Sequence, residues 1–534
     1  MTHPPAVSAT ARRRPTGPLP RLALWSRSVV RAVAVGMAFG VLAPGAALAA
    51  FDLDAVAARA RAMALQPYRA PAPTGNGKLL ALSYDDYRDI RFRPEASLWR
   101  REGLPFELQF FHVGRGFAHP VELHEVVAGQ ARPLDIPRAS FNYGRAAPAV
   151  AGQDRAEVAG FRIHAPINAT TYKDEVIVFL GASYFRAVGA GQHYGLSARG
   201  LGVDTSGGPN GEEFPAFEAY WIERPAGDAQ ALTVYALLNG PRVTGAYRFV
   251  IRPGSATEVE VRSRLFLRAP ATLGIAPLTS MYFGGENSPP RGDFRPEVHD
   301  SDGLQIETGS GEWLWRPLIN PPRPFTTSFS MQGLRGFGLM QRDRNFFSYE
   351  DPEARYDRRP GVWITPIGDW GPGRVELMQF HTEDETNDNT AAYWVPARLP
   401  ARGEPLAMDY LMRWQGDEQQ KPPAGWVTQT RIGRGYEQPR PGEIQFHVDF
   451  MGTALAHLPD DSPPTPEVTT SDNVRVLLAN VYRHPITKGW RMTLKVENRN
   501  ATQPTELRAY LRRGLGQRAG RFVDGRVVHR GGRA

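Results

Sequence analysis

Short apolar or alternating runs of strand length, separated by turn-forming residues, recur along almost the whole of this chain. Clear examples are 106–111, 176–180, 232–237, 247–251 and 259–267. Their length, composition and period of two are typical of β-strands. One stretch, 51–66, is rich in Ala and has helical spacing, and Pro67 ends it. Because no long helical stretches alternate with the strands, a parallel α/β sheet is disfavoured, and we expect an all-β protein built from β-sandwiches.

The chain has 534 residues, which is more than a single domain usually contains. The best linker candidate is the Pro-rich stretch 396–405. Beyond it, strand-like runs at 408–414, 443–450, 474–481 and 491–496 have the size and rhythm of an immunoglobulin-like sandwich. We therefore predict a large β-sandwich over 50–397, a linker over 398–405, an immunoglobulin-like domain over 406–515 and an Arg- and Gly-rich tail over 516–534.

The first 49 residues predict export. Residues 1–31 contain Arg but no acidic residue, an apolar run follows at 32–43, and Ala47-Leu48-Ala49 has the small-x-small form of a cleavage site. This order is typical of a secretory signal peptide. The apolar run is shorter than the roughly 20 residues of a transmembrane helix, which disfavours an uncleaved membrane anchor. The export route is either Sec or, because of Arg12-Arg13-Arg14, twin-arginine.

The net charge of +8 at first suggests a nucleic acid or an anionic membrane as partner. However, residues 1–49 carry +6 and residues 512–534 carry another +6, which leaves −4 for the body of the chain. A mildly acidic body argues against nucleic-acid binding. The chain has no Cys, which excludes disulfides, a thiol nucleophile, iron–sulfur clusters and zinc bound by Cys.

Four carboxylates lie within six residues, at Glu383, Asp384, Glu385 and Asp388. Like charges this close raise one another's pKa, which is one way to keep a carboxylic acid protonated near neutral pH. From the residues alone, three interpretations stay open: an acidic surface loop, a catalytic acid, or a cation site built from Asp and Asn oxygens. The spacing does not match an EF-hand, which disfavours the cation site. A second acidic stretch around Asp300 is also compatible with a common turn.

Aromatic and Arg side chains lie near both acidic stretches in the sequence. The candidates for substrate binding are Trp313, Trp315, Tyr356, Arg359, Trp363, Trp370 and Glu385. Trp313 and Trp315 would share one face of a strand. Aromatic rings stack on the C–H faces of sugars, and charged side chains bind sugar hydroxyls. Core packing explains some of these rings equally well, but rings, paired carboxylates and export together favour glycan chemistry.

Other kinds of site have less support. The 12 His residues are scattered and none follows a metal-binding spacing, so we expect neither a metal nor a cofactor. The sequence contains no Gly-x-Ser-x-Gly nucleophile elbow and no Walker or dinucleotide-binding Gly motif.

Nine motifs, spread over about 51–500, resemble those of the periplasmic glucan biosynthesis proteins of types G and D. They are LGASYFR at 180–186, YGLSARG at 194–200, GEEFP at 211–215, YWIERP at 220–225, GIAPLTS at 274–280, RPEVHD at 295–300, GEWLWRP at 311–317, DETNDN at 384–389 and TKGWR at 487–491. They follow one another in the order of the family. The Phe-Phe-His near 110 and the Arg-rich leader favour the D type.

The resemblance implies a galactose-mutarotase-like β-sandwich joined to an immunoglobulin-like domain. It also implies a periplasmic role in making osmoregulated glucans, whose backbone is β-1,2-linked glucose, by inverting hydrolysis or by transglycosylation. In that scheme Asp388 is the general acid, Asp300 is the base acting through a relay of water, and Glu385 and Tyr356 line the same site. The alternative is a non-catalytic protein that binds glucan and acts as a scaffold with the inner-membrane glucan synthase.

Overall fold

The computed structural model describes residues 50–209, 211–290, 292–433, 440–500, 502–512 and 524–525. The chain divides into two units, 1–49 and 50–534. The predicted signal peptide and most of the predicted tail therefore lie outside the described residues. Within those residues, no helix has both the length and the apolar character needed to span a membrane.

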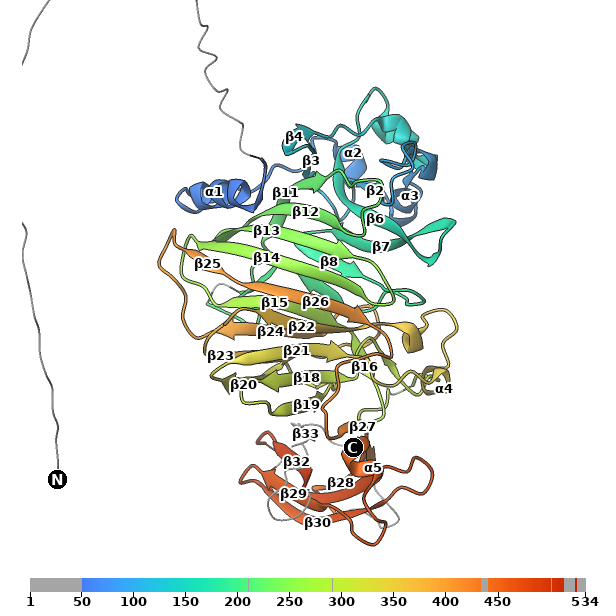
Figure 1. The fold of residues 1–534 in the computed structure, drawn as a ribbon, viewed down its shortest axis with the longest axis vertical. Helices are drawn as coiled ribbons and strands as arrows, with labels where there is room; N and C mark the ends of the chain where they lie inside the picture. Colours follow the sequence, from blue (N-terminus) through green and yellow to red (C-terminus); the bar gives the residue numbers. More distant parts are fainter. Residues whose placement is uncertain are drawn as a thin grey trace, which may run out of the picture. The chain divides into compact units, whose positions relative to one another are not determined.

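Two large sheets, antiparallel except for one parallel pair of strands, form a β-sandwich (Figure 1). The first contains, in order, β2 (Glu107–His112), β6 (Val158–Ala169), β7 (Tyr172–Leu180), β8 (Tyr184–Ala187), β9 (Ser197–Arg199), β15 (Leu273–Ser280), β24 (Thr390–Pro396), β23 (Gly373–Gln379) and β20 (Phe325–Met331), and β10 (Leu201–Val203) pairs with β15. The second contains, in order, β19 (Trp313–Pro317), β18 (Gly303–Thr308), β21 (Leu334–Met340), β22 (Gly361–Ile367), β26 (Asp409–Gln415), β14 (Thr257–Leu267), β13 (Val243–Arg252), β12 (Leu232–Asn239), β11 (Ala216–Glu223), β3 (Glu122–Val127) and β4 (Gln130–Pro133), and β25 (Pro405–Ala407) pairs with β14. The parallel pair is β11 with β3.

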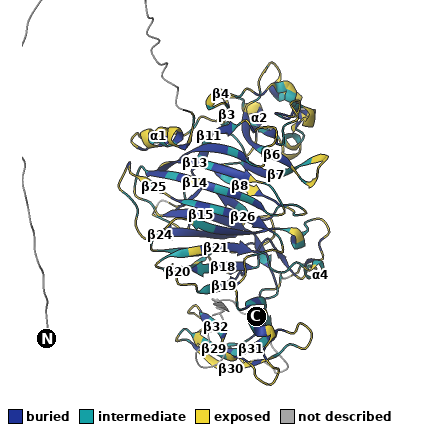
Figure 2. Cartoon of the chain, viewed as in Figure 1, coloured by how far each residue is buried: buried dark blue, intermediate teal, exposed yellow. Residues whose placement is uncertain are grey.

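Alternating side chains of the two sheets meet in one hydrophobic core. The Phe179 ring of β7 lies 5.3 Å from the Phe249 ring of β13, and the Phe161 ring of β6 lies 5.0 Å from the Tyr220 ring of β11. Each such ring removes enough apolar surface from water to contribute about 1.5–3 kcal/mol. Figure 2 shows the central strands of the sandwich as buried. The expectation of an all-β sandwich is confirmed.

The elements expected from the sequence are present. The strand-like runs in 106–267 lie in β2, β7, β12, β13 and β14. The predicted helix is α1 (Leu53–Ala64), which begins after Asp52, whose carboxylate accepts a hydrogen bond from the Ala55 amide. Leu53, Val56 and Ala60 face inward at helical spacing and pack with Trp221 on the outer face of the second sheet.

The predicted boundary between the domains needs a correction. The run 408–414 was expected to begin the second domain, but it forms β26, which pairs with β14 on one side and β22 on the other. Its alternating residues Tyr410, Met412 and Trp414 are buried in the core of the large sandwich. The stretch 398–405 is therefore a connection between β24 and β25, and the chain leaves this sandwich only after Gln415.

The C-terminal part has its own sheet, in the order β27 (Trp426–Gly433), β28 (Glu443–Met451), β31 (Trp490–Asn498) and β30 (Val474–Arg483). The pair β29 (Thr465–Thr470) and β32 (Leu507–Arg512) is joined to β19 by the short β33 (Asp524–Gly525). Side chains of β27, β28, β31 and β32 share one hydrophobic core, and Trp315 and Trp363 of the large sandwich belong to that same core.

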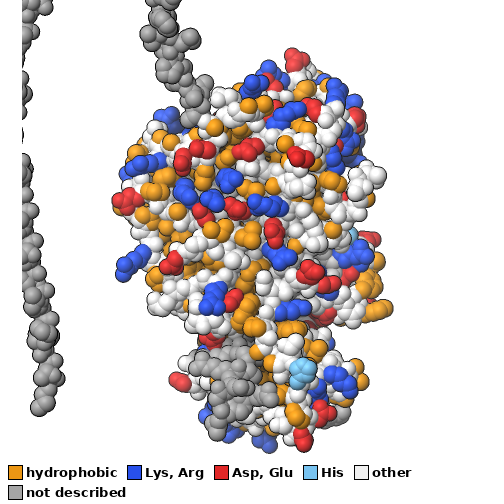
Figure 3. Space-filling model, viewed as in Figure 1, with side chains coloured by type: hydrophobic (Ala, Val, Ile, Leu, Met, Phe, Trp, Pro, Cys, Tyr) orange, Lys and Arg blue, Asp and Glu red, His pale blue; other side chains and the backbone are white. Residues whose placement is uncertain are grey.

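Short elements complete the fold. They are α2 (Gly77–Leu80), α3 (Tyr84–Arg88), α4 (Phe346–Tyr349), α5 (Thr453–Ala456), the pair β1 (Arg91–Phe92) and β5 (Phe141–Asn142), the pair β16 (Tyr282–Gly284) and β17 (Val298–His299), and 3₁₀ turns at Pro94–Ala96, Arg138–Ser140, Gly144–Val150 and Tyr356–Arg358. On the face in view in Figure 3, basic side chains lie among acidic ones. Strand β14 contains an ion pair of Arg262 with Glu260 at 3.0 Å.

Candidate active site

Asp300 lies directly after β17, at the first turn beyond the β16–β17 pair. Its backbone amide donates to the carbonyl of Met281 at 2.9 Å, and its side chain is buried. The buried carboxylate is not left uncompensated, because Nη1 of Arg359 donates to Oδ1 of Asp300 in an ion pair. Removing a carboxylate from water is costly, and a direct guanidinium partner offsets that cost.

Arg359 is held rigidly for this contact. Its Nε and Nη2 donate to the carbonyl of Ala354 at 3.2 and 3.1 Å, and its guanidinium lies 4.1 Å from the centre of the Tyr356 ring. Gly195, from the loop before β9, packs against the stem of this side chain. A Cβ at position 195 would lie only 2.9 Å from Cβ of Arg359, so the close approach requires glycine.

Tyr356 connects this ion pair to Glu385. The Tyr356 hydroxyl donates to Oε2 of Glu385 at 2.9 Å. Burial of the phenol raises the pKa of Tyr356 above its ordinary value, and Arg359 partly opposes this effect. Glu385 also forms an ion pair with Arg295 at 2.6 Å, and Arg295 binds Asp351 at 2.8 Å. The ion pair of Asp300 with Arg359, the cation–π contact of Arg359 with Tyr356 and the hydrogen bond of Tyr356 to Glu385 therefore join Asp300 to Glu385.

Asp388 lies in the loop between β23 and β24, immediately before a buried anchor. That anchor is Asn389, which is fully buried and whose Oδ1 accepts a hydrogen bond from the Tyr282 amide at 2.7 Å. The Nδ2 of Asn389 donates to the carbonyls of Tyr282 and Phe380 at 3.0 and 2.9 Å. These three bonds fix the end of the loop, so the position of Asp388 is determined although the residue itself is exposed.

The environment of Asp388 raises its pKa to about 6. The largest cause is the surrounding protein, which disfavours the charged form of the carboxyl group even though the residue as a whole is exposed, and the charge of Asp300 is the second. Arg199 and Arg186 act in the opposite direction. The sequence suggested that neighbouring carboxylates of the loop would raise this pKa, but the largest contributions come from elsewhere in the fold.

Asp300 and Asp388 are therefore brought to one site. Each lies next to a residue bound to Tyr282: Asn389 hydrogen bonds with the Tyr282 backbone, and His299 is the partner of Tyr282 in the β16–β17 pair. The effect of the Asp300 charge on Asp388 shows that the two carboxylates lie within electrostatic reach. One is buried and paired with a cation, whereas the other is exposed and readily protonated.

A group of residues on β8, β9 and the following loop also faces Asp388, and reasoning from the sequence did not assign it a role. Arg199 forms an ion pair with Glu212 at 2.6 Å and lies over the rings of Tyr184 and Phe214, 4.9 and 5.2 Å from their centres. The negative charge of Asp388 contributes to a raised pKa of Tyr184, after the larger effect of burial. Tyr184, Arg199, Glu212 and Phe214 all lie within the family motifs at 180–186, 194–200 and 211–215. Membership of these motifs is the signal by which the sequence could have identified them.

The predicted tryptophan platforms need a correction. Trp315 and Trp363 are 7% and 4% exposed and belong to the core shared with the C-terminal part. Trp313 is half-buried and stacks on Trp363 with 5.6 Å between ring centres. Trp370 is 7% exposed and donates its indole N–H to the carbonyl of Asp409 at 3.0 Å. Trp313 and Trp315 do share one face of β19, but these rings pack in cores and do not line the site.

Two phenylalanines have the exposure that those tryptophans lack. Phe294 is 79% exposed and is followed by Arg295, whose guanidinium binds Glu385 and lies 5.7 Å from the Phe294 ring. Phe214 is 52% exposed and lies beside Arg199. The rings are thus next to the two ends of the Asp300 and Asp388 site, where an aromatic face is open to solvent.

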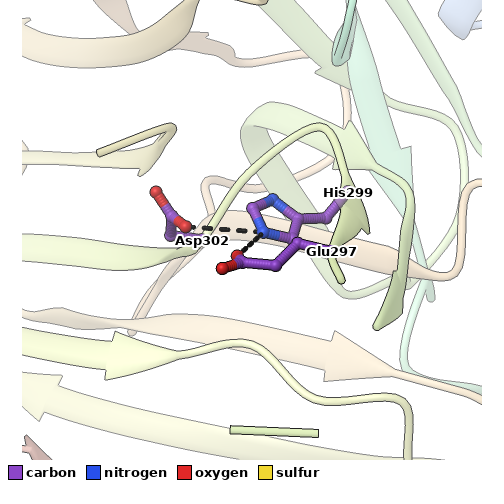
Figure 4. A group of neighbouring side chains, drawn as sticks. All are labelled: Glu297, His299 and Asp302. Atoms are coloured by element: carbon purple, nitrogen blue, oxygen red, sulfur yellow. Dashed lines mark hydrogen bonds and ion pairs between the residues drawn. The ribbon is translucent and has the colours of Figure 1, made fainter. Parts of the chain in front are cut away.

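A second titratable cluster lies behind Asp300, where the large sandwich meets β27. His299 is fully buried, and its Nε2 is 2.9 Å from Glu297 Oε2 and 3.6 Å from Asp302 Oδ1 (Figure 4). Its Nδ1 is 3.0 Å from Gln341 Oε1. Glu286 lies nearby and accepts a hydrogen bond from the Thr430 amide on β27 at 3.1 Å. Within the described residues this is the group whose donor atoms are close enough for a metal ion, all within 4.8 Å.

The pKa values of this cluster are strongly shifted. Burial raises the pKa of Glu286 to about 8 and that of Asp302 to about 6. Burial alone would lower the pKa of His299, but its carboxylate partners more than compensate and raise it to about 9. A charged His299 between carboxylates is a satisfied internal ion-pair cluster, and we assign it no metal.

A cross-strand row links the site to the far edge of the first sheet. Register places Gln109, Arg162, Val178 and Arg186 directly opposite one another on β2, β6, β7 and β8. The row continues through Ser197 and Thr279, which are paired on β9 and β15. Neighbouring strands lie about 4.8 Å apart, so this mostly polar row extends for roughly 24 Å over the outer face.

The chain was compared with known proteins. A family model described as "Periplasmic glucan biosynthesis protein, MdoG" matches residues 51–520. Glucans biosynthesis protein G of Ralstonia nicotianae is 50% identical over 490 residues, covering 90% of this chain and 97% of that protein. Proteins of the same name from Pseudomonas syringae pv. tomato and Pseudomonas aeruginosa are 46% and 44% identical, covering 87% and 91% of this chain and 74% and 93% of those proteins.

These relatives have the type G name, so the preference of the sequence motifs for the D type finds no support in them. Both the family model and the relatives cover almost all of the chain outside the first 49 residues. The all-β sandwich and the order of the nine motifs agree with this match. The chain therefore belongs to the periplasmic glucan biosynthesis protein family, MdoG.

Proposed function

We propose that this protein is exported to the periplasm and cleaves the backbone of a β-1,2-linked glucan with inversion at the anomeric carbon. The observation that supports this most directly is the pairing of Asp388 and Asp300 in contrasting environments. A carboxyl with a pKa near 6 can donate a proton at neutral pH, and a carboxylate held beside Arg359 remains able to accept one. Export is supported by the N-terminal sequence pattern and by the name of the family.

The proposed reaction uses both groups in one step. Asp388 gives its proton to the glycosidic oxygen as the bond to the anomeric carbon breaks. A water molecule attacks that carbon from the opposite face, and its proton passes to Asp300. Asp300 is buried against Arg359, so we propose that one or more further waters relay this proton. In transglycosylation, the hydroxyl of an acceptor sugar replaces the attacking water, and the proton balance is the same.

The other residues of the site have positioning roles in this proposal. Arg359 binds and orients Asp300, Tyr356 connects that ion pair to Glu385, and Glu385 offers an exposed carboxylate to sugar hydroxyls. The polar row from Arg186 to Gln109 provides further partners for a polysaccharide that crosses the outer face of the sheet.

The test is incubation of the purified protein with linear β-1,2-glucan, followed by product analysis by chromatography and by NMR of the new anomeric centre. We expect α-anomeric product from the native protein and a loss of about 10²–10⁴-fold in rate for Asp388→Asn. Glu383→Gln, an exposed carboxylate change in the same loop, is the matched control and should retain activity. Binding without turnover by all three proteins would instead favour a non-catalytic scaffold that works with a membrane glucan synthase.

A further inference from the structure

A pocket of about 800 Å³ lies far from Asp388 along the first sheet, where α3, β1, β2 and β6 meet. In Figure 1 these elements lie at the end of the sandwich opposite β19. Its volume is within the range of 300–1,000 Å³ that is usual for sites of small molecules. Two of its lining residues, Gln109 and Arg162, belong to the polar row proposed for glucan binding, but no lining residue has a role in the proposed bond cleavage.

The lining of the pocket is strongly basic. It includes Arg88, Arg91, Arg93 and Arg162 but only one carboxylate, that of Glu95. Arg162 already pairs with Glu175 at 2.8 Å. The other three arginines are exposed, and none of them forms an ion pair with any residue in the described ranges. Three guanidinium groups thus line one cavity without a direct ion pair to a described residue, although the charge of Asp89 acts on two of them, Arg88 and Arg91.

The backbone holds two of these arginines in place. Arg91 and Arg93 flank Phe92, which is buried in the core, so alternation along the chain directs both arginines to the opposite, outer side. Arg91 is paired with Asn142 of β5, and the Arg93 amide donates to the Ser140 carbonyl at 2.8 Å. Arg145 forms ion pairs with both Asp86 and Asp89, at 3.3 and 2.8 Å, and the Asp89 carboxylate also interacts electrostatically with Arg91 and Arg88.

The remaining wall suits a polar organic group. The amide side chains of Gln109 and Asn142 line the pocket, and so does the half-buried Phe111 ring, which lies 5.2 Å from the Arg162 guanidinium. Amides can hydrogen bond with hydroxyl groups, and an aromatic ring can pack on the C–H face of a sugar. The pocket therefore combines a cationic end with a surface for a small hydroxylated molecule.

We propose that this pocket binds the phosphate group of a ligand with a hydroxylated part, such as a phosphorylated sugar or the head of an anionic lipid. Guanidinium groups bind phosphate oxygens in paired hydrogen bonds, and three arginines that form no direct ion pair with a described residue offer more donors than the two oxygens of a carboxylate can accept. The site is separate from the proposed cleavage centre and does not depend on its activity.

The experiment is calorimetric titration of the purified protein with glucose 6-phosphate, glucose and inorganic phosphate, together with sedimentation with phosphatidylglycerol or phosphatidylcholine vesicles. We expect glucose 6-phosphate to bind more tightly than glucose or phosphate, and the affinity to fall as salt is raised. The double variant Arg91→Gln/Arg93→Gln should weaken binding at least about tenfold. Arg335→Gln, an exposed arginine on β21, is the control and should bind as the native protein does.

The two sources of phosphate give different results. Binding to phosphatidylglycerol vesicles but not to glucose 6-phosphate, abolished in the double variant, would identify a lipid head as the ligand. The proposal is overturned if neither probe binds, if glucose binds as well as glucose 6-phosphate, or if the double variant retains full affinity. Thermal unfolding of the double variant shows whether it is folded, and the salt dependence of the native protein tests the proposal without any variant.

Discussion

The side chain of Asn389 hydrogen bonds with both backbone groups of Tyr282, accepting from its amide at 2.7 Å and donating to its carbonyl at 3.0 Å. An amide side chain that binds both groups of one residue in this way imitates a neighbouring strand. Asp388 directly precedes Asn389, and Asp300 directly follows His299, which is the strand partner of Tyr282. Both carboxylates are therefore held next to Tyr282, and its contact with Asn389 sets their relative positions. The loop that contains Asp388 is thereby fixed at the end nearest the site.

Asn389→Ala is expected to destabilise the protein. The change leaves the amide and carbonyl of Tyr282 and the carbonyl of Phe380 without their partners, and an unsatisfied buried polar group costs about 1–3 kcal/mol. We expect a loss of about 2–4 kcal/mol in the free energy of unfolding, measured by denaturant titration. Asn387→Ala, an exposed change two residues away, should have little effect. Equal stability of the two variants would show that the Tyr282 contact does not hold the loop.

The proposed general acid predicts a specific pH dependence. With a pKa of about 6 for Asp388, the protonated fraction falls as pH rises above 6, so kcat/KM should decline on the alkaline side. Arg186 lowers this pKa, and its removal in Arg186→Gln should shift the decline to higher pH. Arg224→Gln, an exposed change on the far side of the second sheet, is the control. An unchanged alkaline limb in Arg186→Gln would exclude Asp388 as the titrating acid.

The cluster of Glu286, Asp302 and His299 predicts how stability depends on pH. Folding raises the pKa of Glu286 from 4.5 to about 8 and that of His299 from 6.5 to about 9. The folded state therefore binds more protons than the unfolded state, and the free energy of unfolding must fall as pH rises through this range. The histidines whose pKa is lowered by burial titrate below pH 6.5, so they do not mask the effect between pH 7 and 9.

Denaturant titrations at pH 7, 8 and 9 measure this effect. We expect a decrease on the order of 3 kcal/mol over that range. Glu286→Gln removes one of the two groups and should reduce the decrease by roughly half, whereas Glu418→Gln, an exposed change, should leave it intact. A flat profile for the native protein would mean that the cluster does not retain its protons.

The all-β fold could be predicted from the sequence, and the choice of Asp300 and Asp388 follows from the family resemblance, but the burial of the predicted tryptophan platforms could not be foreseen. Alternation identifies β26 as a strand, yet it does not reveal that Tyr410 and Trp414 fill the core of the large sandwich and not that of a second domain. An indole ring suits a sugar and a core equally well, and only the tertiary structure shows that Trp315 and Trp363 meet the C-terminal strands. Arg199 and Arg186 are distant in sequence from Asp388, and sheet register brings them to it.

Phe214 and Phe294 are the aromatic platforms that we expect in place of those tryptophans. Both rings are exposed next to side chains of the site, and a sugar face stacked on such a ring loses contact area when the ring is removed. Phe214→Ala and Phe294→Ala should each raise KM for linear β-1,2-glucan by about threefold to tenfold, since an aromatic contact contributes about 0.5–1.5 kcal/mol, and should change kcat less. Tyr172→Ala, an equally exposed ring on β7, is the matched control. The affinity for glucan can also be measured without turnover in the double variants that combine Asp388→Asn with Phe214→Ala or with Phe294→Ala. If both double variants bind glucan as tightly as Asp388→Asn alone, neither ring is a platform.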